Sequence, residues 1–130
     1  MLSISRSGAI LLAALLLPAA GAAADDLTVS FKFGSADKCS RKSPELKIGN
    51  APAGTTQFKV RLRDNDKRSW RHGGGTVAAD ASGVIPAGAL TDGYNGPCPP
   101  SGSHEYEFLV EALDANGDTL AEGSATQSFP

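Results

Sequence analysis

The stretch HEYEFLVEALDANGD, residues 104–118, indicates the fold more directly than any other part of the chain. Alternate positions from His104 to Ala112 hold mostly aromatic or aliphatic side chains, and the positions between them are mostly glutamate. This period of two is typical of a β-strand that packs one face inward and presents the other to water. The Asn116-Gly117 pair favours a hairpin turn, although the aspartates around it also suggest a calcium loop. We therefore expect an antiparallel partner strand to follow.

The same alternation recurs earlier in the chain. Odd positions are apolar and even positions polar in Leu27–Phe33, and Phe58–Arg63 repeats the pattern with cations on its outer face. No segment of comparable length repeats its apolar residues at the helical period. The sequence therefore predicts an all-β fold, a small antiparallel β-sandwich with little or no helix, formed by residues 25–130.

The first 24 residues have the features of a secretory signal peptide. Arg6 supplies a positive charge, Ala9–Leu17 is an apolar stretch too short to span a bilayer, and Ala22–Ala24 offers small residues for cleavage. We expect cleavage before Asp25. The mature protein should then be soluble, secreted or periplasmic, and without a transmembrane anchor.

The charge of the chain disfavours two classes of partner. The chain contains 12 basic and 14 acidic residues, and removal of Arg6 with the signal peptide leaves 11 against 14, a net charge of −3. Nucleic acids and anionic membrane surfaces both favour a basic face. We therefore expect neither to be the main partner.

Cys39 and Cys98 are the two cysteines of the chain. Disulfides persist in exported proteins, so we expect the two residues to pair, closing a loop that the chain-entropy model values at about 4 kcal/mol. A reactive thiol is the alternative. Metal ligation is disfavoured, because no second cysteine or histidine lies at ligand spacing from either residue.

Two polar residues occupy core-facing positions at strand ends. Asp64 is the next inward position after Leu62, and His104 is the first inward position of its own strand. Both side chains are costly to bury without a partner. We expect them to meet at one rim of the sandwich, the alternative being that each reaches water separately.

The outer face of the earlier strand carries Lys59, Arg61 and Arg63. We expect these cations to pair across strands with glutamates such as Glu105 or Glu107, as on an ordinary solvated surface. Three glycines, Gly73–Gly75, follow His72 directly. They favour a flexible connector, and an anion-binding nest of backbone N–H groups is the alternative.

Three motifs remain to be explained. The first covers residues 43–66 and reads SPELKIGNAPAGTTQFKVRLRDND, and the second covers residues 70–72 and reads WRH. The third is a proline-rich loop, residues 93–106, that reads GYNGPCPPSGSHEY and ends in His-x-Tyr. Together they resemble the phosphatidylethanolamine-binding protein (PEBP) family, in particular its bacterial Raf-kinase-inhibitor-like branch. The loop is the most specific part of the resemblance, and in that family it forms a wall of an anion-binding pocket.

The resemblance implies a pocket for a small anion, either phosphate-like or a lipid head group. Two imidazoles and a phenol can donate hydrogen bonds to such an anion, while carboxylates orient the rings. We expect Asp64 to orient His72 or His104, and we expect no metal, cofactor or catalytic residue. The residues that match the pocket positions of the family are Asp64, Asp66, Trp70, His72, Pro100, His104 and Tyr106.

The chain also departs from the family pattern. Asn65 replaces the proline of an Asp-Pro-Asp motif, Gly73–Gly75 replace an apolar strand, and the segment between Pro86 and Tyr94 lacks most of a longer insertion. The chain therefore resembles a shortened, divergent member, in which the likeness of fold exceeds the likeness of function.

Three classes of function follow from these observations. The first is an exported, non-enzymatic protein that binds an anion in the pocket. The alternative is a surface-acting inhibitor of the protease- or kinase-inhibitor kind, or another interaction protein, with a relic pocket and a protein partner. An enzyme comes third, because Cys98 lies close to His104 in sequence, but a cysteine nucleophile requires a free thiolate that a disulfide would remove.

Overall fold

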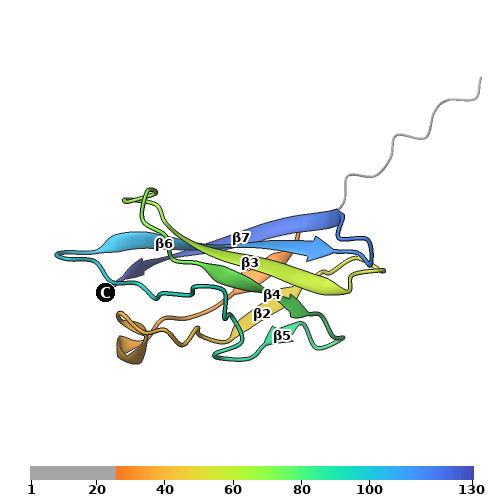
Figure 1. Ribbon diagram of the computed structural model, residues 1–130, viewed down its shortest axis with the longest axis horizontal. Helices are drawn as coiled ribbons and strands as arrows, with labels where there is room; N and C mark the ends of the chain where they lie inside the picture. The colour runs from red at the N-terminus through yellow and green to blue at the C-terminus, as the bar shows by residue number, and fades with distance from the viewer. Residues whose placement is uncertain (1–25) are drawn as a thin grey trace, which may run out of the picture.

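The computed structural model describes residues 26–130, which form two antiparallel sheets (Figure 1). The predicted signal peptide, residues 1–24, lies outside the described residues. One sheet has the strand order β1 (Thr28–Ser30), β2 (Leu46–Gly49), β5 (Val84–Ile85). The other has the order β4 (Gly74–Ala78), β3 (Gln57–Asp64), β6 (His104–Leu113), β7 (Thr119–Phe129). With only the short 3-10 helix η1 (Ser35–Asp37) in this range, the prediction of an all-β antiparallel fold is confirmed.

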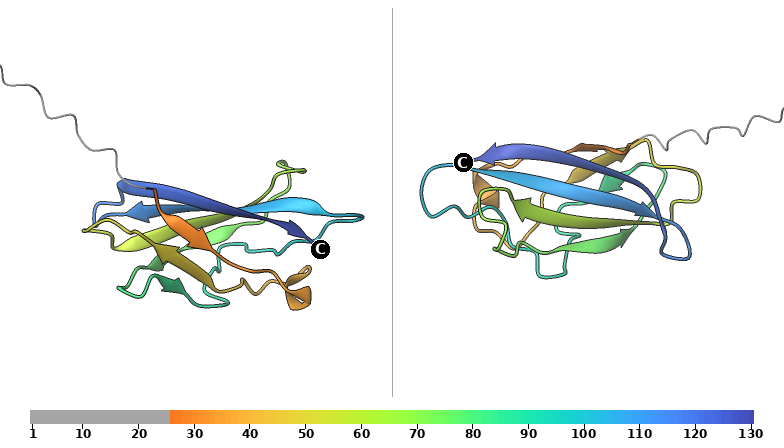
Figure 2. Two further views of the ribbon diagram at one scale, coloured as in Figure 1. Left: turned by 180° about the vertical axis from the view of Figure 1, so that it is seen from behind. Right: turned by 90° about the horizontal axis from the view of Figure 1, so that it is seen from above.

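The two sheets form two layers, and Figure 2 shows the four-stranded sheet extending over the three-stranded one. β3 and β6 each bury every second residue along most of their length, as the alternation predicts. Phe108 of β6 is fully buried, and its ring centroid lies 4.7 Å from that of Phe31 and 5.8 Å from that of Phe33. The segment that follows β1 therefore joins the layers through aromatic contacts, which stabilise the core.

The predicted hairpin joins β6 to β7. Residues 104–113 pair with residues 119–129, and the N–H of Gly117 donates to the carbonyl of Asp114 over 3.0 Å. Oδ1 of Asp114 accepts the N–H groups of Asn116 and Asp118, each at 2.9 Å. The aspartate side chain thus closes the turn, as is common for Asp at such positions.

The three glycines do not form a flexible connector, and that interpretation is wrong. Gly74 and Gly75 begin β4 and pair with Arg61 and Val60 of β3. A Cβ atom on Gly74 would lie 1.9 Å from the carbonyl oxygen of Val60, so only glycine permits this close approach. Gly73 has a φ of 65°, a conformation that glycine adopts readily. These residues bring the preceding residue, His72, against the end of the sandwich.

The outer face of the four-stranded sheet carries cross-strand ion pairs. Arg63 pairs with Glu107, as expected. Nζ of Lys59 lies 3.9 Å from Oε2 of Glu111, so the partner of Lys59 is Glu111 and not Glu105. Arg61 is opposite Leu109 and makes no ion pair with another residue in the range 26–130. In that same range, the structure contains no helix long and apolar enough to span a membrane.

Candidate functional site

The sequence-predicted site residues gather at the end of the sandwich where β3 ends and β6 begins, on the left in Figure 1. Asp64, the last residue of β3, is in register with Tyr106 of β6. His104 is the first residue of β6 and pairs with Phe129. The β3–β4 loop and the proline-rich segment before β6 meet at the same end, because His72 and Asn95 exchange hydrogen bonds.

Asp64 is fully buried and holds His104. Its Oδ2 lies 2.7 Å from Nδ1 of His104, and its Oδ1 accepts the N–H groups of Asp66 and Lys67 at 2.9 and 3.0 Å. Burial alone would raise the pKa of Asp64, but these hydrogen bonds outweigh it and hold the pKa below its usual value. The expected meeting of Asp64 and His104 is confirmed, and Asp64 stays charged at neutral pH.

Asp66 is exposed and joins the β3–β4 loop to β6 through Oδ2, which accepts the N–H of Glu105 at 2.7 Å. Ligand atoms of Asp64, Asp66 and His104 lie within 4.8 Å of one another, a spacing that could hold a cation. Three of the four carboxylate oxygens already accept hydrogen bonds from N–H groups, which leaves Oδ1 of Asp66. The arrangement therefore suits the orientation of His104 better than a metal centre.

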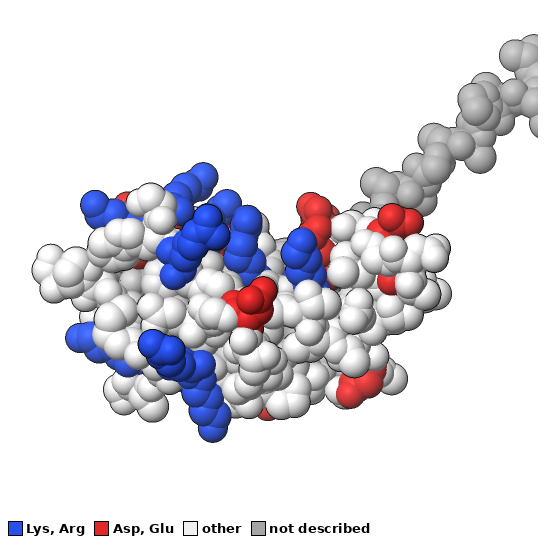
Figure 3. All heavy atoms as spheres, viewed as in Figure 1, with Lys and Arg blue, Asp and Glu red and all other residues white. Residues whose placement is uncertain are grey.

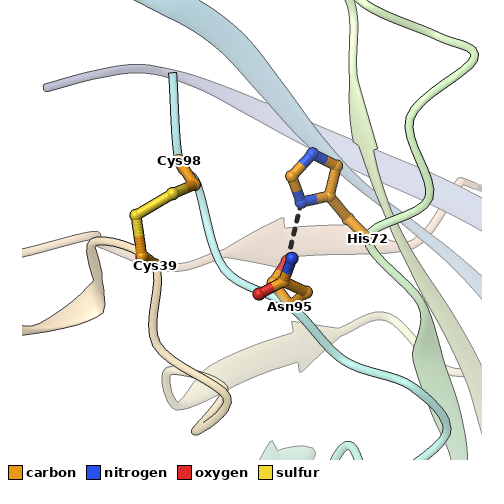
Figure 4. Close-up of a disulfide and its surroundings, with 4 residues drawn as sticks. All are labelled: Cys39, His72, Asn95 and Cys98. Carbon is orange, nitrogen blue, oxygen red and sulfur yellow. Dashed lines mark hydrogen bonds between the residues drawn. A yellow bond between two sulfur atoms is a disulfide. The ribbon is translucent and has the colours of Figure 1, made fainter. Parts of the chain in front are cut away.

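His72 is 4% exposed and is oriented by a backbone carbonyl instead of a carboxylate. Its Nδ1 donates to the carbonyl oxygen of Asn95 over 2.7 Å (Figure 4), and the N–H of Asn95 donates back to the carbonyl of His72. The buried Nε2 of His72 has no hydrogen-bond partner in the described part of the chain. Sequence reasoning missed Asn95, although it lies inside the proline-rich loop that carries the family resemblance.

Tyr106 is fully buried and contacts both imidazole rings. Its ring centroid lies 5.5 Å from that of His72, in an edge-on arrangement, and 6.2 Å from that of His104. Burial and then the negative charge of Asp64 raise the pKa of Tyr106 to about 12. Its hydroxyl therefore remains protonated, and Oη has no hydrogen-bond partner among residues 26–130.

Trp70 and Pro100 lie at the surface. The side chain of Trp70 is 42% exposed, and its ring centroid is 6.2 Å from that of His104. Pro100 is exposed, whereas the neighbouring Pro97 and Pro99 are buried. Pro100 lines neither of the two hollows beside His72, so its part in a pocket stays a prediction.

Two hollows flank the segment that ends in His72. One, of about 430 Å³, is lined by Ser69, Trp70, Arg71, His72, Asn95 and Cys98. The other, of about 810 Å³, shares Ser69 to His72 and extends past Arg61, Arg63 and Arg68 to Asp92. A further hollow of about 630 Å³ lies away from both histidines on the outer face of the four-stranded sheet, among the paired Lys59 and Glu111. The first hollow is bordered by His72 and by Cys98 of the disulfide, whereas His104 and Tyr106 line neither of the two hollows beside His72.

The disulfide between Cys39 and Cys98 confirms the expected pairing and fixes the wall of this site (Figure 4). The two Cα atoms are 4.7 Å apart, the N–H of Cys39 donates to Pro97 over 2.9 Å, and that of Gly96 donates to Ser40 over 2.7 Å. Both cysteines of the chain are thus engaged. Cys98 offers no thiolate, which removes the cysteine nucleophile on which the enzyme hypothesis depended.

The sequence matches one known family along most of its length. The family model described as phosphatidylethanolamine-binding protein matches residues 19–129. The chain belongs to the PEBP family. The disulfide, the proline-rich loop and the two histidines described above are therefore features of a PEBP member.

Two solved structures share the fold of this PEBP member. Escherichia coli YbcL, described as a new member of the mammalian PEBP family, has a TM-score of 0.62 at 20% identity, over 81% of this chain and 98% of that chain. The PEBP homolog CT736 from Chlamydia trachomatis D/UW-3/CX has a TM-score of 0.54 at 19% identity, over 81% of this chain and 97% of that chain. At this level of identity, the similarity shows the fold alone.

A curated relative matches over a short segment. The UPF0098 protein of Archaeoglobus fulgidus is 58% identical over 31 residues, which are 24% of this chain and 9% of that protein. The chain therefore spans only about a tenth of the length of this relative.

Proposed function

We propose that this PEBP member is an exported, secreted or periplasmic protein that binds a phosphate-like or lipid head-group anion between His72, His104 and Tyr106. One observation carries the proposal. Two buried polar atoms, Nε2 of His72 and Oη of Tyr106, have no partner among residues 26–130. The ring centroid of Tyr106 lies 5.5 Å from that of His72 and 6.2 Å from that of His104, which Asp64 orients. A buried polar atom without a hydrogen bond costs about 1–3 kcal/mol, which an oxygen atom of a ligand would recover.

The hydrogen bonds at Nδ1 determine what each imidazole can offer to a ligand. Both partners at Nδ1, the carbonyl of Asn95 and the carboxylate of Asp64, are acceptors only. The proton of each neutral ring therefore lies on Nδ1, and Nε2 becomes a donor only when the ring gains a second proton. Binding of an anion at Nε2 should therefore be accompanied by proton uptake, so that a lower pH favours binding.

The site also supports binding better than catalysis. Cys98 is held in the disulfide, and the raised pKa of Tyr106 makes its hydroxyl a poor base or nucleophile at neutral pH. A protonated phenol is, however, a suitable donor to an anion. Because Oη and Nε2 are shielded from water, we expect side chains of the exposed segment around Trp70 to move when a ligand enters.

Calorimetric titration of inorganic phosphate and of phosphoethanolamine tests this function. We expect tighter binding at pH 5.5 than at pH 8, with a net proton uptake that appears as a dependence of the binding heat on the ionisation enthalpy of the buffer. His72 and His104 are the two histidines of the chain, so the double variant His72→Gln/His104→Gln should lose both the affinity and the pH dependence.

Two results would contradict this pocket as the site. Equal affinity at both pH values, with no proton uptake at pH 8 where the phosphate is already a dianion, would show that the imidazoles do not donate to the anion. Unchanged binding in the double variant would place the anion elsewhere. Either outcome would favour the alternative function, an inhibitor or interaction protein that acts through its surface.

A further inference from the structure

Residues 65–71 of the β3–β4 loop carry a charge opposite to that of the rest of the chain. This segment contains three cations, Lys67, Arg68 and Arg71, and one acid, Asp66. Removing these from the totals of 12 basic and 14 acidic residues leaves 9 against 13 elsewhere. All three cations are exposed, and Figure 3 shows Lys and Arg side chains gathered where this loop projects, at the upper left. The net charge of the whole chain, which disfavoured an anionic membrane as a partner, does not reveal that the cations of this segment are separated from the acidic remainder.

The same loop presents Trp70 to solvent. It is the one large hydrophobic side chain that is exposed among residues 26–130, with an exposure of 42%. Nζ of Lys67 lies 5.8 Å from the centroid of its ring. A tryptophan surrounded by cations is typical of segments that lie at the interface between a membrane and water, where the indole ring occupies the head-group region.

The cations around Trp70 are available to a partner. Within residues 26–130, neither the three loop cations nor Arg61 makes an ion pair, whereas Arg63 is already paired with Glu107. Arg61 lines the larger hollow together with Arg68 and Arg71, so the basic surface continues from the loop onto β3. Asp92 also lines this hollow, and Asp66 uses one oxygen to hold the loop to β6.

We propose that residues 65–71 dock the protein on an anionic lipid bilayer, with Trp70 among the head groups and Lys67, Arg68 and Arg71 against lipid phosphates. Charge complementarity and the exposed indole both support this partner. Because the rest of the chain is acidic, an anionic membrane should repel that part of the molecule. The protein should therefore be oriented with residues 65–71 facing the membrane. Docking does not depend on the proposed anion pocket.

The emission of the single tryptophan of the chain tests the proposal, because it reports on this loop alone. We expect a blue shift of Trp70 fluorescence with vesicles of phosphatidylglycerol and phosphatidylcholine, and no shift with phosphatidylcholine alone. Salt should weaken the effect, since exposed charges are screened within about 10 Å at 0.1 M ionic strength. Each cation near an anionic surface contributes roughly fivefold to partitioning.

Charge variants separate the loop from general electrostatics. Lys67→Gln/Arg68→Gln should weaken partitioning to the anionic vesicles by roughly 25-fold, from two cations at about fivefold each. Lys32→Gln/Lys47→Gln removes the same charge from exposed positions outside the loop and should change partitioning little. His104→Gln should keep the vesicle-induced shift while it loses phosphate binding, so failure of docking and failure of the pocket can be told apart.

Several results would overturn the proposal. One is the absence of a shift in Trp70 emission with anionic vesicles, and another is an equal shift with phosphatidylcholine alone. A third is a loss of partitioning in Lys32→Gln/Lys47→Gln as large as that in Lys67→Gln/Arg68→Gln. A shift of Trp70 emission with poly-aspartate but not with vesicles would instead assign the surface to an acidic polypeptide.

Discussion

At the scale of single residues, Asp64 organises the candidate site. Its carboxylate is fully buried, accepts two backbone N–H groups from the β3–β4 loop and holds the ring of His104. A buried charge of this kind is tolerated only when its hydrogen bonds are satisfied. Asp64 therefore contributes to stability and to the position of His104 at once.

The Asp64→Asn variant tests this double role. We expect the free energy of unfolding at neutral pH to fall by about 2 kcal/mol, because the charged hydrogen bond to His104 is lost while Asn still accepts from the backbone. The folded-state pKa of Asp64 is lowered, so its contribution is present above the unfolded value of about 3.9 and is lost as the pH falls through the folded pKa. Urea unfolding should show the difference between parent and variant shrinking as the pH drops below about 4.

Asp66→Asn provides the matched control. Asp66 is exposed, and an amide oxygen can still accept the N–H of Glu105, so this variant should lose little stability. If the two variants were equally destabilised, or if the Asp64 deficit stayed constant down to pH 2, the carboxylate would not have the role that its contacts indicate.

At the scale of elements, the pairing of β4 with β3 determines where His72 lies. The N–H of Leu62 donates to the carbonyl of Gly73 over 2.9 Å, and this contact extends the strand pair up to the residue next to His72. The pairing depends on close approach of two backbones at Gly74. A side chain there would separate the strands and displace the histidine.

Gly74→Ala should therefore lower the free energy of unfolding by at least about 2 kcal/mol, since the new Cβ would meet the backbone of β3 and not a movable side chain. Gly34→Ala is the matched control, because Gly34 has an extended conformation and its nearest neighbour to a Cβ would be 3.9 Å away. It should be neutral or stabilising by up to about 1 kcal/mol through the unfolded state. Thermal unfolding of both variants measures the contrast, and equal effects would refute the steric argument.

At the scale of the whole molecule, a small domain is held together by one cross-link. Cys39 and Cys98 are 59 residues apart in the chain, and their bond joins the segment after η1 to the proline-rich loop. A domain of this size buries a modest fraction of its unfolded surface, so a disulfide supplies a large part of its net stability.

Cys39→Ser/Cys98→Ser should lower the free energy of unfolding by about 4 kcal/mol, the loop-closure value for this separation. The proline-rich loop should also become more mobile, because only hydrogen bonds, such as those at Asn95, Gly96 and Pro97, would then hold it. Denaturant unfolding and amide hydrogen exchange measure the two effects. Unchanged stability, or unchanged protection of residues 93–103, would show that backbone contacts suffice to fix this wall.

The sequence by itself determined the strands and one polar contact of this protein. Side chains alternate between the faces of a strand, so the pattern of β3 and β6 specified both the core and the inward direction of Asp64 and His104. The Asn116-Gly117 turn specified the β6–β7 hairpin. Motifs in the proline-rich loop indicated the family, because they are local and specific.

Only the tertiary structure decided how the loops complete the site. The carbonyl of Asn95 positions His72, whereas the sequence suggested only the carboxylate of Asp64 as a partner for a histidine. Pairing with the backbone of β3 makes Gly74 and Gly75 part of a strand, whereas the sequence favoured a flexible connector. Trp70 and its neighbouring cations likewise form one exposed surface because the β3–β4 loop projects from the sandwich. Loops have no periodicity that fixes the direction of their side chains, so contacts with residues distant in sequence determine their geometry.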